Sequence, residues 1–266
     1  MQNSRRPVQE MRERRMTGNG MENVLITGVT GGIGKELASE LLEGGSSVIG
    51  LYRTATKEIK DLAGQHPGRL FLHEADLMDS ENLGVLVKAL VDEHGPIGGF
   101  VHCAGSDRMV PLHLTKPEDI EKLWRLHALA PMLMIAAISR KKNHMENMGI
   151  VLISSQSAHE GAMGHTAYAA AKGAVEGYLA PAAAELMEKG IRINEVCLAP
   201  VRTPMAAGWM DKLTDEGRWK LMESYPLGIG EARDVANLIC FLLGKESRWI
   251  NGQVITADGG HAVRKV

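Results

Sequence analysis

The chain has 266 residues, of which 44% are hydrophobic and 23% charged, and its formal net charge is −2. This nearly balanced charge disfavours nucleic-acid and strongly acidic partners, and no apolar run reaches the ~18–20 residues of a membrane span. Three widely spaced cysteines (Cys103, Cys197 and Cys240) indicate buried thiols in a reducing, cytoplasmic compartment, with neither disulfides nor a metal site.

The first twenty residues differ from the rest of the chain. They are rich in Arg, Glu and Gln and lack the apolar core of a secretion signal. We expect residues 1–20 to be a disordered tail, or to precede a true start at Met16 or Met21; the alternative is a functional arm. We expect residues 21–266 to form a single domain, which their length allows.

From Glu22 onward, short β-branched or aliphatic runs alternate with longer helical patterns. The first group predicts strands at residues 24–26, 47–51, 70–73, 98–102, 150–153, 191–196 and 253–256. The second group predicts helices at residues 35–43, 82–93, 117–140, 166–189 and 231–243. This alternation is typical of an α/β fold with a doubly wound parallel sheet of about seven strands and helices on both faces. Ligands of such Rossmann-type sheets bind outside the carboxyl ends of the strands.

A glycine-rich loop follows the first predicted strand directly. It reads Thr27-Gly28-Val29-Thr30-Gly31-Gly32-Ile33-Gly34. Glycines there allow a tight turn and let the backbone approach a pyrophosphate at the N-terminus of the next helix. The spacing differs from the usual GxGxxG, and the alternative is an ordinary strand-to-helix turn. Its place between a strand and a helix favours a dinucleotide.

Tyr168 and Lys172 lie four positions apart on a predicted helix, and Ser155 precedes Tyr168 by thirteen positions. Residues at this spacing share a helix face. There the ammonium could lower the tyrosine pKa from its usual ~10. Such a tyrosine exchanges a proton with a substrate oxygen near neutral pH. On its own this spacing is more often solvated helix surface, so its weight comes from the motifs around it.

Taken together, these motifs resemble the short-chain dehydrogenase/reductase family, and most of all its 3-oxoacyl-[acyl-carrier-protein] reductases. The resemblance covers residues 22 to about 262. Besides the loop and the Ser155, Tyr168 and Lys172 group, it rests on short motifs at residues 76–77, 104–105, 192–194, 203–205, 234–236, 251–253 and 258–260.

The resemblance implies a role for each matching residue. Tyr168 is the general acid for carbonyl reduction, Lys172 lowers its pKa and holds the nicotinamide ribose, and Ser155 polarises the carbonyl. Asp76 accepts a hydrogen bond from the adenine; its alternative role is to cap a turn. The cofactor contacts implied are Gly28, Thr30, Gly31, Gly32, Ile33, Gly34, Asp76, Leu77, Ala104, Gly105, Tyr168, Lys172, Val201 and Thr203.

The end of the second strand bears on the choice of cofactor. In Rossmann-type sites an acidic residue there binds the ribose 2′-OH, whereas an arginine accommodates the 2′-phosphate of NADP. The chain has Tyr52 where NAD-dependent members of the family place Asp, and Arg53 and Thr54 follow. Arg53 can pair with the phosphate and Thr54 can donate a hydrogen bond to it. The sequence therefore favours NADP(H) over NAD(H); the alternative is a merely solvated Arg53.

Three departures from the family pattern stand out. His102 and Cys103 replace an Asn-Asn pair whose amides tie the central strands together, and His102 could partly substitute. The resemblance implies that His127 replaces the catalytic-relay asparagine, whose backbone carbonyl holds a water leading to the lysine. We expect His127 either to keep that backbone role while its imidazole joins the relay, as a catalytic residue, or simply to pack. Leu198-Ala199 replace a Pro-Gly pair near the nicotinamide.

The substrate side is less informative. Residues 205–210 predict an apolar helix over the site. His159 and His165 could face the substrate, although loop histidines are usually solvated. The leading interpretation is NADPH-dependent reduction of a small ketone or a 3-oxoacyl thioester, free or carrier-bound. The alternatives are a dehydrogenase of a secondary alcohol, such as a sugar or polyketide hydroxyl, and a non-catalytic NADP-binding regulator. We expect a homotetramer or homodimer built through residues 117–140 and 166–189, with neither nucleic acid nor membrane as partner.

Overall fold

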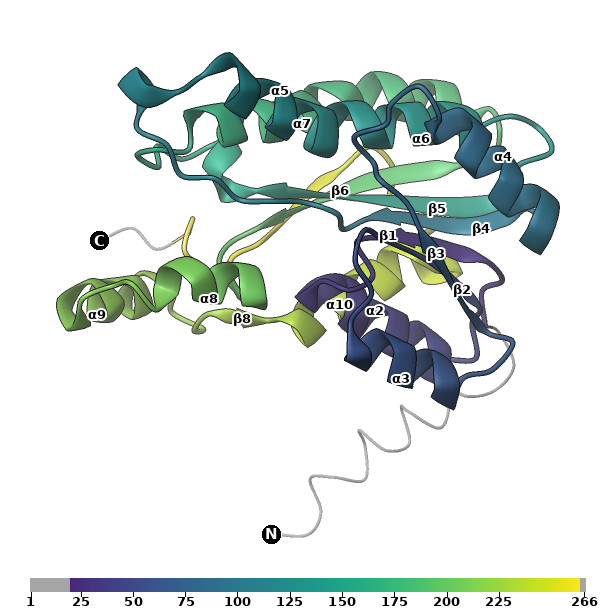
Figure 1. Ribbon diagram of the computed structural model, residues 1–266, viewed down its shortest axis with the longest axis horizontal. Coiled ribbons are helices and arrows are strands. Elements are labelled where there is room, and N and C mark those ends of the chain that lie inside the picture. The colour runs from purple at the N-terminus through teal and green to yellow at the C-terminus, as the bar shows by residue number, and fades with distance from the viewer. Residues whose placement is uncertain (1–19, 264–266) are drawn as a thin grey trace, which may run out of the picture.

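A seven-stranded parallel sheet forms the centre of the computed structural model, which describes residues 20–263 (Figure 1). The strand order is β3-β2-β1-β4-β5-β6-β9, and every neighbouring pair is parallel. The strands are β1 (Val24–Thr27), β2 (Val48–Tyr52), β3 (Leu70–Glu74), β4 (Ile97–His102), β5 (His144–Ser155), β6 (Arg192–Leu198) and β9 (Val254–Ala257). The predicted doubly wound parallel sheet is confirmed. The tail expected at residues 1–20 lies, except for Gly20, outside the described residues.

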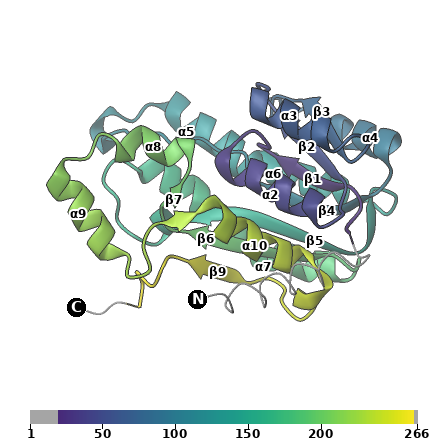
Figure 2. The ribbon, with the colours of Figure 1, turned by 90° about the horizontal axis from the view of Figure 1, so that it is seen from below.

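Helices cover both faces of this sheet. Figure 1 shows one layer above it, and Figure 2 shows the opposite layer from below. The upper layer contains α4 (Leu83–His94), α5 (Pro117–Trp124), α6 (Ala130–Ile138) and α7 (Thr166–Met187). The lower layer contains α2 (Gly32–Glu43), α3 (Lys57–Gln65) and α10 (Ala232–Leu243). No helix among residues 20–263 is both long enough and apolar enough to span a membrane.

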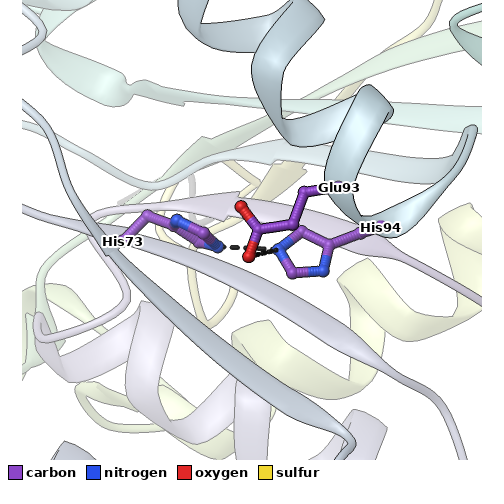
Figure 3. Close-up of side chains that lie close together, drawn as sticks. All are labelled: His73, Glu93 and His94. Atoms are coloured by element: carbon purple, nitrogen blue, oxygen red, sulfur yellow. Dashed lines mark hydrogen bonds and ion pairs between the residues drawn. The ribbon is translucent and has the colours of Figure 1, made fainter.

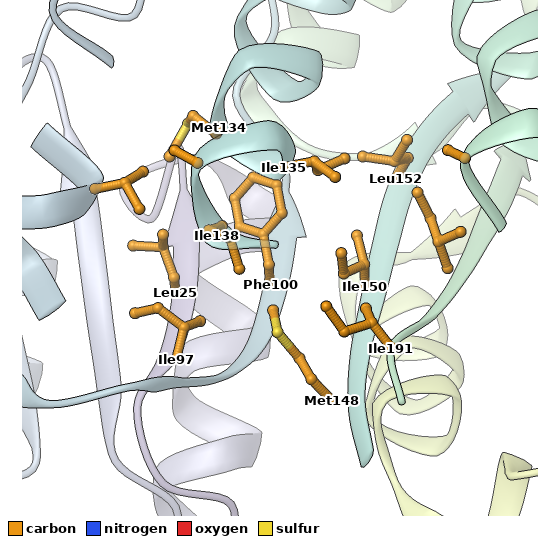
Figure 4. Close-up of a cluster of buried hydrophobic side chains, with 14 of the residues drawn as sticks. Leu25, Ile97, Phe100, Met134, Ile135, Ile138, Met148, Ile150, Leu152 and Ile191 are labelled. Carbon is orange, nitrogen blue, oxygen red and sulfur yellow. The ribbon is translucent and has the colours of Figure 1, made fainter. Parts of the chain in front are cut away.

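Two hydrophobic cores result from the alternation of side chains along the strands. Phe100, Ile150 and Leu152 point toward the upper helices, where they pack with Met134 and Ile135 of α6 (Figure 4). Their strand neighbours point to the lower core, which contains Val24, Ile26, Val101, Val151 and Val196. Because successive side chains leave a strand on opposite faces, strands buried on both sides are largely apolar.

Several elements differ from those expected. The helix predicted at residues 117–140 is interrupted by a π-helical segment, η2 (Arg125–Leu129). The short helices α3 and α9 (Asp215–Ser224) were not predicted. Each is largely exposed, with Ile59 the one buried residue of α3 and no buried residue in α9. The apolar stripe of α3 is short, with Ile59, Leu62 and Ala63 against the lower core, and α9 buries no residue by which an amphipathic helix could be identified.

The carboxyl ends of the strands converge on one edge of the sheet. His102 ends β4, Ser155 ends β5 and Leu198 ends β6. Thr166 to Met187 form α7, which packs over β5 and β6. The predicted helix at residues 205–210 is observed as α8 (Pro204–Met210). The assignment of residues 21–266 to a single domain stays a prediction.

Candidate active site

The glycine loop between β1 and α2 leaves no room for side chains. Gly28 has φ +68°, and a Cβ there would lie 2.7 Å from Cα of Ala104. A Cβ on Gly34 would lie 2.4 Å from the carbonyl oxygen of Gly28. The helix begins at Gly32, and its N-cap Gly31 makes no side-chain capping bond. The first N–H groups of α2 thus have no side-chain cap from residue 31, which leaves them available to the pyrophosphate of a dinucleotide.

Thr203 follows β6 in the chain and lies across from this loop at the same edge of the sheet. A Cβ on Gly32 would lie 2.8 Å from Cγ2 of Thr203. The Thr203 hydroxyl accepts a hydrogen bond of 3.3 Å from the backbone N–H of Ala206 and so begins α8. The structure therefore places Thr203 beside the glycine loop, as expected for a residue near a bound diphosphate.

A cavity of about 330 Å³ opens at the carboxyl ends of β4, β5 and β6. Nine of the predicted site residues line it: Ile33, Ala104, Gly105, His127, Ser155, Tyr168, Lys172, Val201 and Thr203. The predicted adenine-side residues lie outside its lining. Among them, Arg53, Thr54 and Asp76 are exposed, and Leu77 is buried. Asp76 accepts a hydrogen bond of 2.9 Å from the N–H of Met78, so it caps a turn.

Lys172 is 4% exposed and extends from α7 toward the sheet. Its Nζ donates a hydrogen bond of 2.7 Å to the carbonyl oxygen of Ile153 and lies 5.7 Å from the centre of the Tyr168 ring. Burial lowers the pKa of Lys172 to about 8, although nearby Glu195 acts in the opposite direction. The ammonium thus titrates close to neutral pH.

The pKa of Tyr168 differs from the expectation. Burial and the negative charge of Asp107 raise it to about 12, against a lowering influence of the Ser155 hydroxyl. The expected lowering by Lys172 is not observed, because Lys172 is directed at the Ile153 carbonyl and desolvation dominates. Tyr168 is therefore fully protonated at neutral pH, which is the state of a proton donor.

Ser155 ends β5 next to this tyrosine. Its hydroxyl accepts a hydrogen bond of 3.2 Å from the N–H of Ser157 and donates one of 3.3 Å to the Ser157 hydroxyl. Because a hydroxyl proton rotates freely, the same group can turn toward a substrate oxygen in the cavity.

His127 lies in the π-helical segment with its side chain against the catalytic group. The ring is 2% exposed and stands at 86° to the ring of Tyr168, with 5.3 Å between centroids. Its Nε2 lies 2.8 Å from the carbonyl oxygen of Ser106 and 3.3 Å from the backbone N of Ser106, so it donates to the former or accepts from the latter according to the tautomer. Burial lowers the pKa of His127 well below its usual value, and Nδ1 has no partner among the described residues. The imidazole is therefore neutral, and its part in the relay stays a prediction.

His102 takes over the bonding of the family's asparagine. Its Nδ1 lies 2.9 Å from the Thr27 hydroxyl on β1, and its Nε2 lies 3.0 Å from the carbonyl oxygen of Leu126. The Thr27 hydroxyl also accepts from the N–H of Ala104. His102 thus joins β1 to β4, as expected if it partly substitutes for the amide pair. Neighbouring Cys103 is buried enough that its thiol pKa rises to about 12.

Asp107 and His165 form a pair that the sequence did not reveal. His165 Nε2 lies 3.2 Å from Asp107 Oδ1, and both residues line the cavity. The His165 side chain is 15% exposed, so of the two alternatives for this histidine the structure favours the one that faces the cavity. The one available signal was the position of Asp107, an acid two residues after Ala104-Gly105.

A second group of polar side chains lies away from the cavity, between β3 and the end of α4 (Figure 3). The Nε2 atoms of His73 and His94 are 2.8 Å apart, and Glu93 Oε1 lies 3.6 Å from His94 Nε2. Two nitrogens bound tetrahedrally to one zinc ion at ~2.0–2.1 Å would lie ~3.3 Å apart. The geometry is that of a hydrogen bond between two imidazoles, and the absence of a metal site stays a prediction.

Comparison with known proteins gives matches over nearly the whole chain. The family model described as Enoyl-(Acyl carrier protein) reductase matches residues 28–262. A 3-oxoacyl-[acyl-carrier-protein] reductase of Thermotoga maritima is 31% identical over 89% of this chain and 96% of its own length. A diacetyl reductase of Staphylococcus epidermidis is 29% identical over 91% and 99%, respectively. A solved blue fluorescent protein from a metagenomic library, in complex with NADPH, has a TM-score of 0.82 at 27% identity, over 91% of this chain and 98% of that one.

Proposed function

The chain belongs to the short-chain dehydrogenase/reductase family, and we propose that it reduces a small ketone or a 3-oxoacyl thioester with NADPH. As a family member it is an oxidoreductase that acts on CH–OH or C=O groups. One observation carries the proposal. Ser155, Tyr168 and Lys172 line a single cavity that the glycine loop borders through Ile33. A proton donor, a carbonyl-polarising hydroxyl and a dinucleotide cradle thus meet at one place.

Residues on both sides of the cavity fit the cofactor. The crowded glycines and the uncapped start of α2 suit the pyrophosphate, and Lys172 suits the nicotinamide ribose. When bound there, the cofactor supplies the hydride. Arg53 supports NADPH over NADH, because it is exposed and forms no ion pair within residues 20–263. A relative with the same fold was solved in complex with NADPH.

The chain's own groups handle the proton. Tyr168 donates its hydroxyl proton to the substrate oxygen as the carbonyl becomes an alcohol. Its pKa of about 12 keeps that proton available across the neutral range. The Ser155 hydroxyl donates a hydrogen bond to the same oxygen and stabilises the charge that develops on it. Oxidation of an alcohol would use the same group as a base in its phenolate form, which burial disfavours near pH 7.

The cavity walls support a neutral substrate. Met205 and Trp209 of α8 form an apolar wall, whereas Asp107 and Glu160 contribute the acidic groups. Lys172 is the one Lys or Arg side chain among the described lining residues. These acids would repel a carboxylate on the reacting part of the substrate. A diketone or an uncharged thioester therefore suits the site better.

A substrate panel tests this proposal. Oxidation of NADPH would be followed with diacetyl, an acetoacetyl thioester and a 2-oxo acid as substrates. We expect turnover of the first two and little turnover of the 2-oxo acid, because its carboxylate faces Asp107 and Glu160. Preferential reduction of the acid, or oxidation of secondary alcohols as the sole activity, would contradict the proposal.

A further inference from the structure

Asp107 is an acid in the cavity wall that the proposed proton transfer does not use. Its Oδ1 is buried and has no hydrogen-bond partner among residues 20–263. The side chain as a whole is still 22% exposed, which leaves Oδ2 as the oxygen that a ligand in the cavity can reach. A carboxylate is costly to keep in a largely apolar wall without hydrogen bonds, so its presence there indicates a role in binding.

The cations near Asp107 are engaged elsewhere. Arg108 follows it in the chain, but Nη2 of Arg108 lies 2.8 Å from Oδ1 of Asp119, and its side chain is 53% exposed. Lys172 donates its hydrogen bond to a backbone carbonyl. Within residues 20–263, the basic side chain paired with Asp107 is His165, whose Nε2 lies 3.2 Å from Oδ1. Asp107 therefore keeps free hydrogen-bonding capacity at Oδ2.

Two loops hold this pair in place. The loop after β4 carries Asp107, and the loop before α7 carries His165. The N–H of Val110 joins them by donating a hydrogen bond of 2.8 Å to the carbonyl oxygen of Gly164. Gly164 has φ +82°, and a Cβ there would lie 2.6 Å from Cγ of Met109, so the two loops are closely packed. A side chain held in this way can bind a ligand group without first being ordered.

The pair lies beside the candidate proton donor. The rings of His165 and Tyr168 stand at 69° to each other, with 5.9 Å between their centroids. The negative charge of Asp107 is close enough to raise the pKa of Tyr168, and both residues of the pair line the same cavity as Tyr168 and Ser155. A substrate whose carbonyl oxygen meets Tyr168 and Ser155 therefore has its neighbouring carbons near Asp107.

The chemistry of the wall determines which group would bind there. An ionised carboxylate accepts hydrogen bonds and donates none, so the group must be a donor. The second acid of the wall, Glu160, also lies beside a histidine, with 3.4 Å between its Oε2 and Nε2 of His261. With a histidine next to each acid, the wall suits a neutral donor better than a full positive charge. A hydroxyl is the smallest neutral donor that a ketone can carry.

We propose that Asp107, held by His165, accepts a hydrogen bond from a substrate hydroxyl close to the reacting carbonyl, so that the substrate is a hydroxyketone. This inference rests on the proposed function and narrows its small ketones to that class. The ketone becomes a diol, and the hydroxyl at Asp107 is unchanged in the reaction. Asp107 thus sets specificity by contacting the substrate, because a site built to bind a hydroxyl rejects the analogue that lacks it. His165 is a positioning residue.

Pairs of substrates of equal size test the inference. Hydroxyacetone and butanone differ by a hydroxyl in place of a methyl group, as do 4-hydroxy-2-butanone and 2-pentanone. Because a hydroxyl also changes the intrinsic reactivity of a ketone, the ratio of the two kcat/KM values within a pair is compared between variants. We expect Asp107→Ala to lower this ratio at least about tenfold in one of the pairs, since a charge-assisted hydrogen bond is lost.

Asp107→Asn keeps the shape of the side chain and should lower the ratio less, because a neutral oxygen is a weaker acceptor. The matched control is Asp211→Ala, at an exposed acid that ends α8 and does not line the cavity; it should leave the ratio unchanged. An unchanged ratio in both Asp107 variants, with both pairs of substrates, would overturn the inference.

His165→Phe tests the positioning role, because it keeps an aromatic ring beside Tyr168 and removes the partner of Asp107. We expect a lower kcat/KM with the hydroxyketone and unchanged kinetics with the matched ketone. An equal loss with both substrates would show that His165 has only a structural role.

Binding separates this inference from the proposed function. Saturation-transfer NMR would follow hydroxyacetone and butanone with the wild type and with Asp107→Ala. We expect the hydroxyacetone signal to weaken in the variant and the butanone signal to stay the same. If no ketone is reduced, the proposed function fails, and this contrast still decides whether Asp107 binds a hydroxyl. Equal hydroxyacetone signals in the two proteins would overturn the inference.

Discussion

Burial sets the charge of nearly every titratable side chain around the cavity. His102 and His127 are kept neutral, Tyr168 keeps its proton, and Glu195 is held close to half-protonated at pH 7. Lys172 is the group that carries positive charge, and its pKa of about 8 makes that charge depend on pH. We therefore expect the charges of this site to change with pH more than with ionic strength, because salt screens buried charges only weakly.

His102 makes the fold sensitive to acid. Burial lowers its pKa to about 3, whereas in the unfolded chain it is ~6.5. Between these values the unfolded chain binds more protons, so the free energy of unfolding decreases as the pH falls below ~6.5. His102→Asn keeps hydrogen-bonding groups at this position. Between pH 7.5 and pH 4.5, we expect the free energy of unfolding of this variant to fall by about 3 kcal/mol less than that of the wild type. Urea unfolding at the two pH values measures this, and equal losses would contradict it.

We expect the proposed preference for NADPH to depend on Arg53. Charge-assisted hydrogen bonds contribute ~1.5–3 kcal/mol, so Arg53→Ala should raise the KM for NADPH by about 10- to 100-fold and leave the KM for NADH nearly unchanged. Lys57→Ala, at an exposed lysine at the start of α3, is the control. A parallel rise in both KM values would show that Arg53 does not read the 2′-phosphate.

At the scale of elements, the start of α2 depends on glycine. A Cβ at Gly34 would meet the Gly28 carbonyl oxygen at 2.4 Å, so the loop backbone must move in Gly34→Ala. We expect at least about tenfold weaker NADPH binding, measured by fluorescence titration, since the cradle for the pyrophosphate is displaced. Gly84→Ala in α4, where nothing lies within 4 Å of the new Cβ, should bind normally and unfold at an equal or higher temperature.

The predictability of the elements follows from their burial. The seven strands were recognised because each is an apolar run, and the glycine loop and the Ser155, Tyr168 and Lys172 group because their spacing is local. Helices α3 and α9 were not predicted because most of their side chains are exposed. The environments of Asp107 and Glu195 were not predicted, because they depend on contacts between residues far apart in the sequence. Asp107 lies in the loop after β4 and raises the pKa of Tyr168. In the sequence, Glu195 is simply one polar residue within a strand.

At the scale of the molecule, we expect the outer face of α7 to contact a second copy of the chain. A Cβ at Gly173 or Gly177 would meet no atom within 4 Å, and with Ala169 and Ala170 they form a face of small residues that permits close approach of a second helix. We therefore expect a homodimer or homotetramer, and Gly177→Arg should dissociate it. Light scattering measures the mass; a wild-type mass equal to the 28.9 kDa of one chain would contradict this.

The central claim is that Tyr168 supplies the proton in an NADPH-dependent reduction. Its most direct test is the turnover of Tyr168→Phe with an acetoacetyl thioester or diacetyl, with NADPH binding measured in parallel. The account predicts a kcat reduced by ~10²–10⁴, with NADPH bound as tightly as by the wild type. Wild-type turnover in this variant would contradict it.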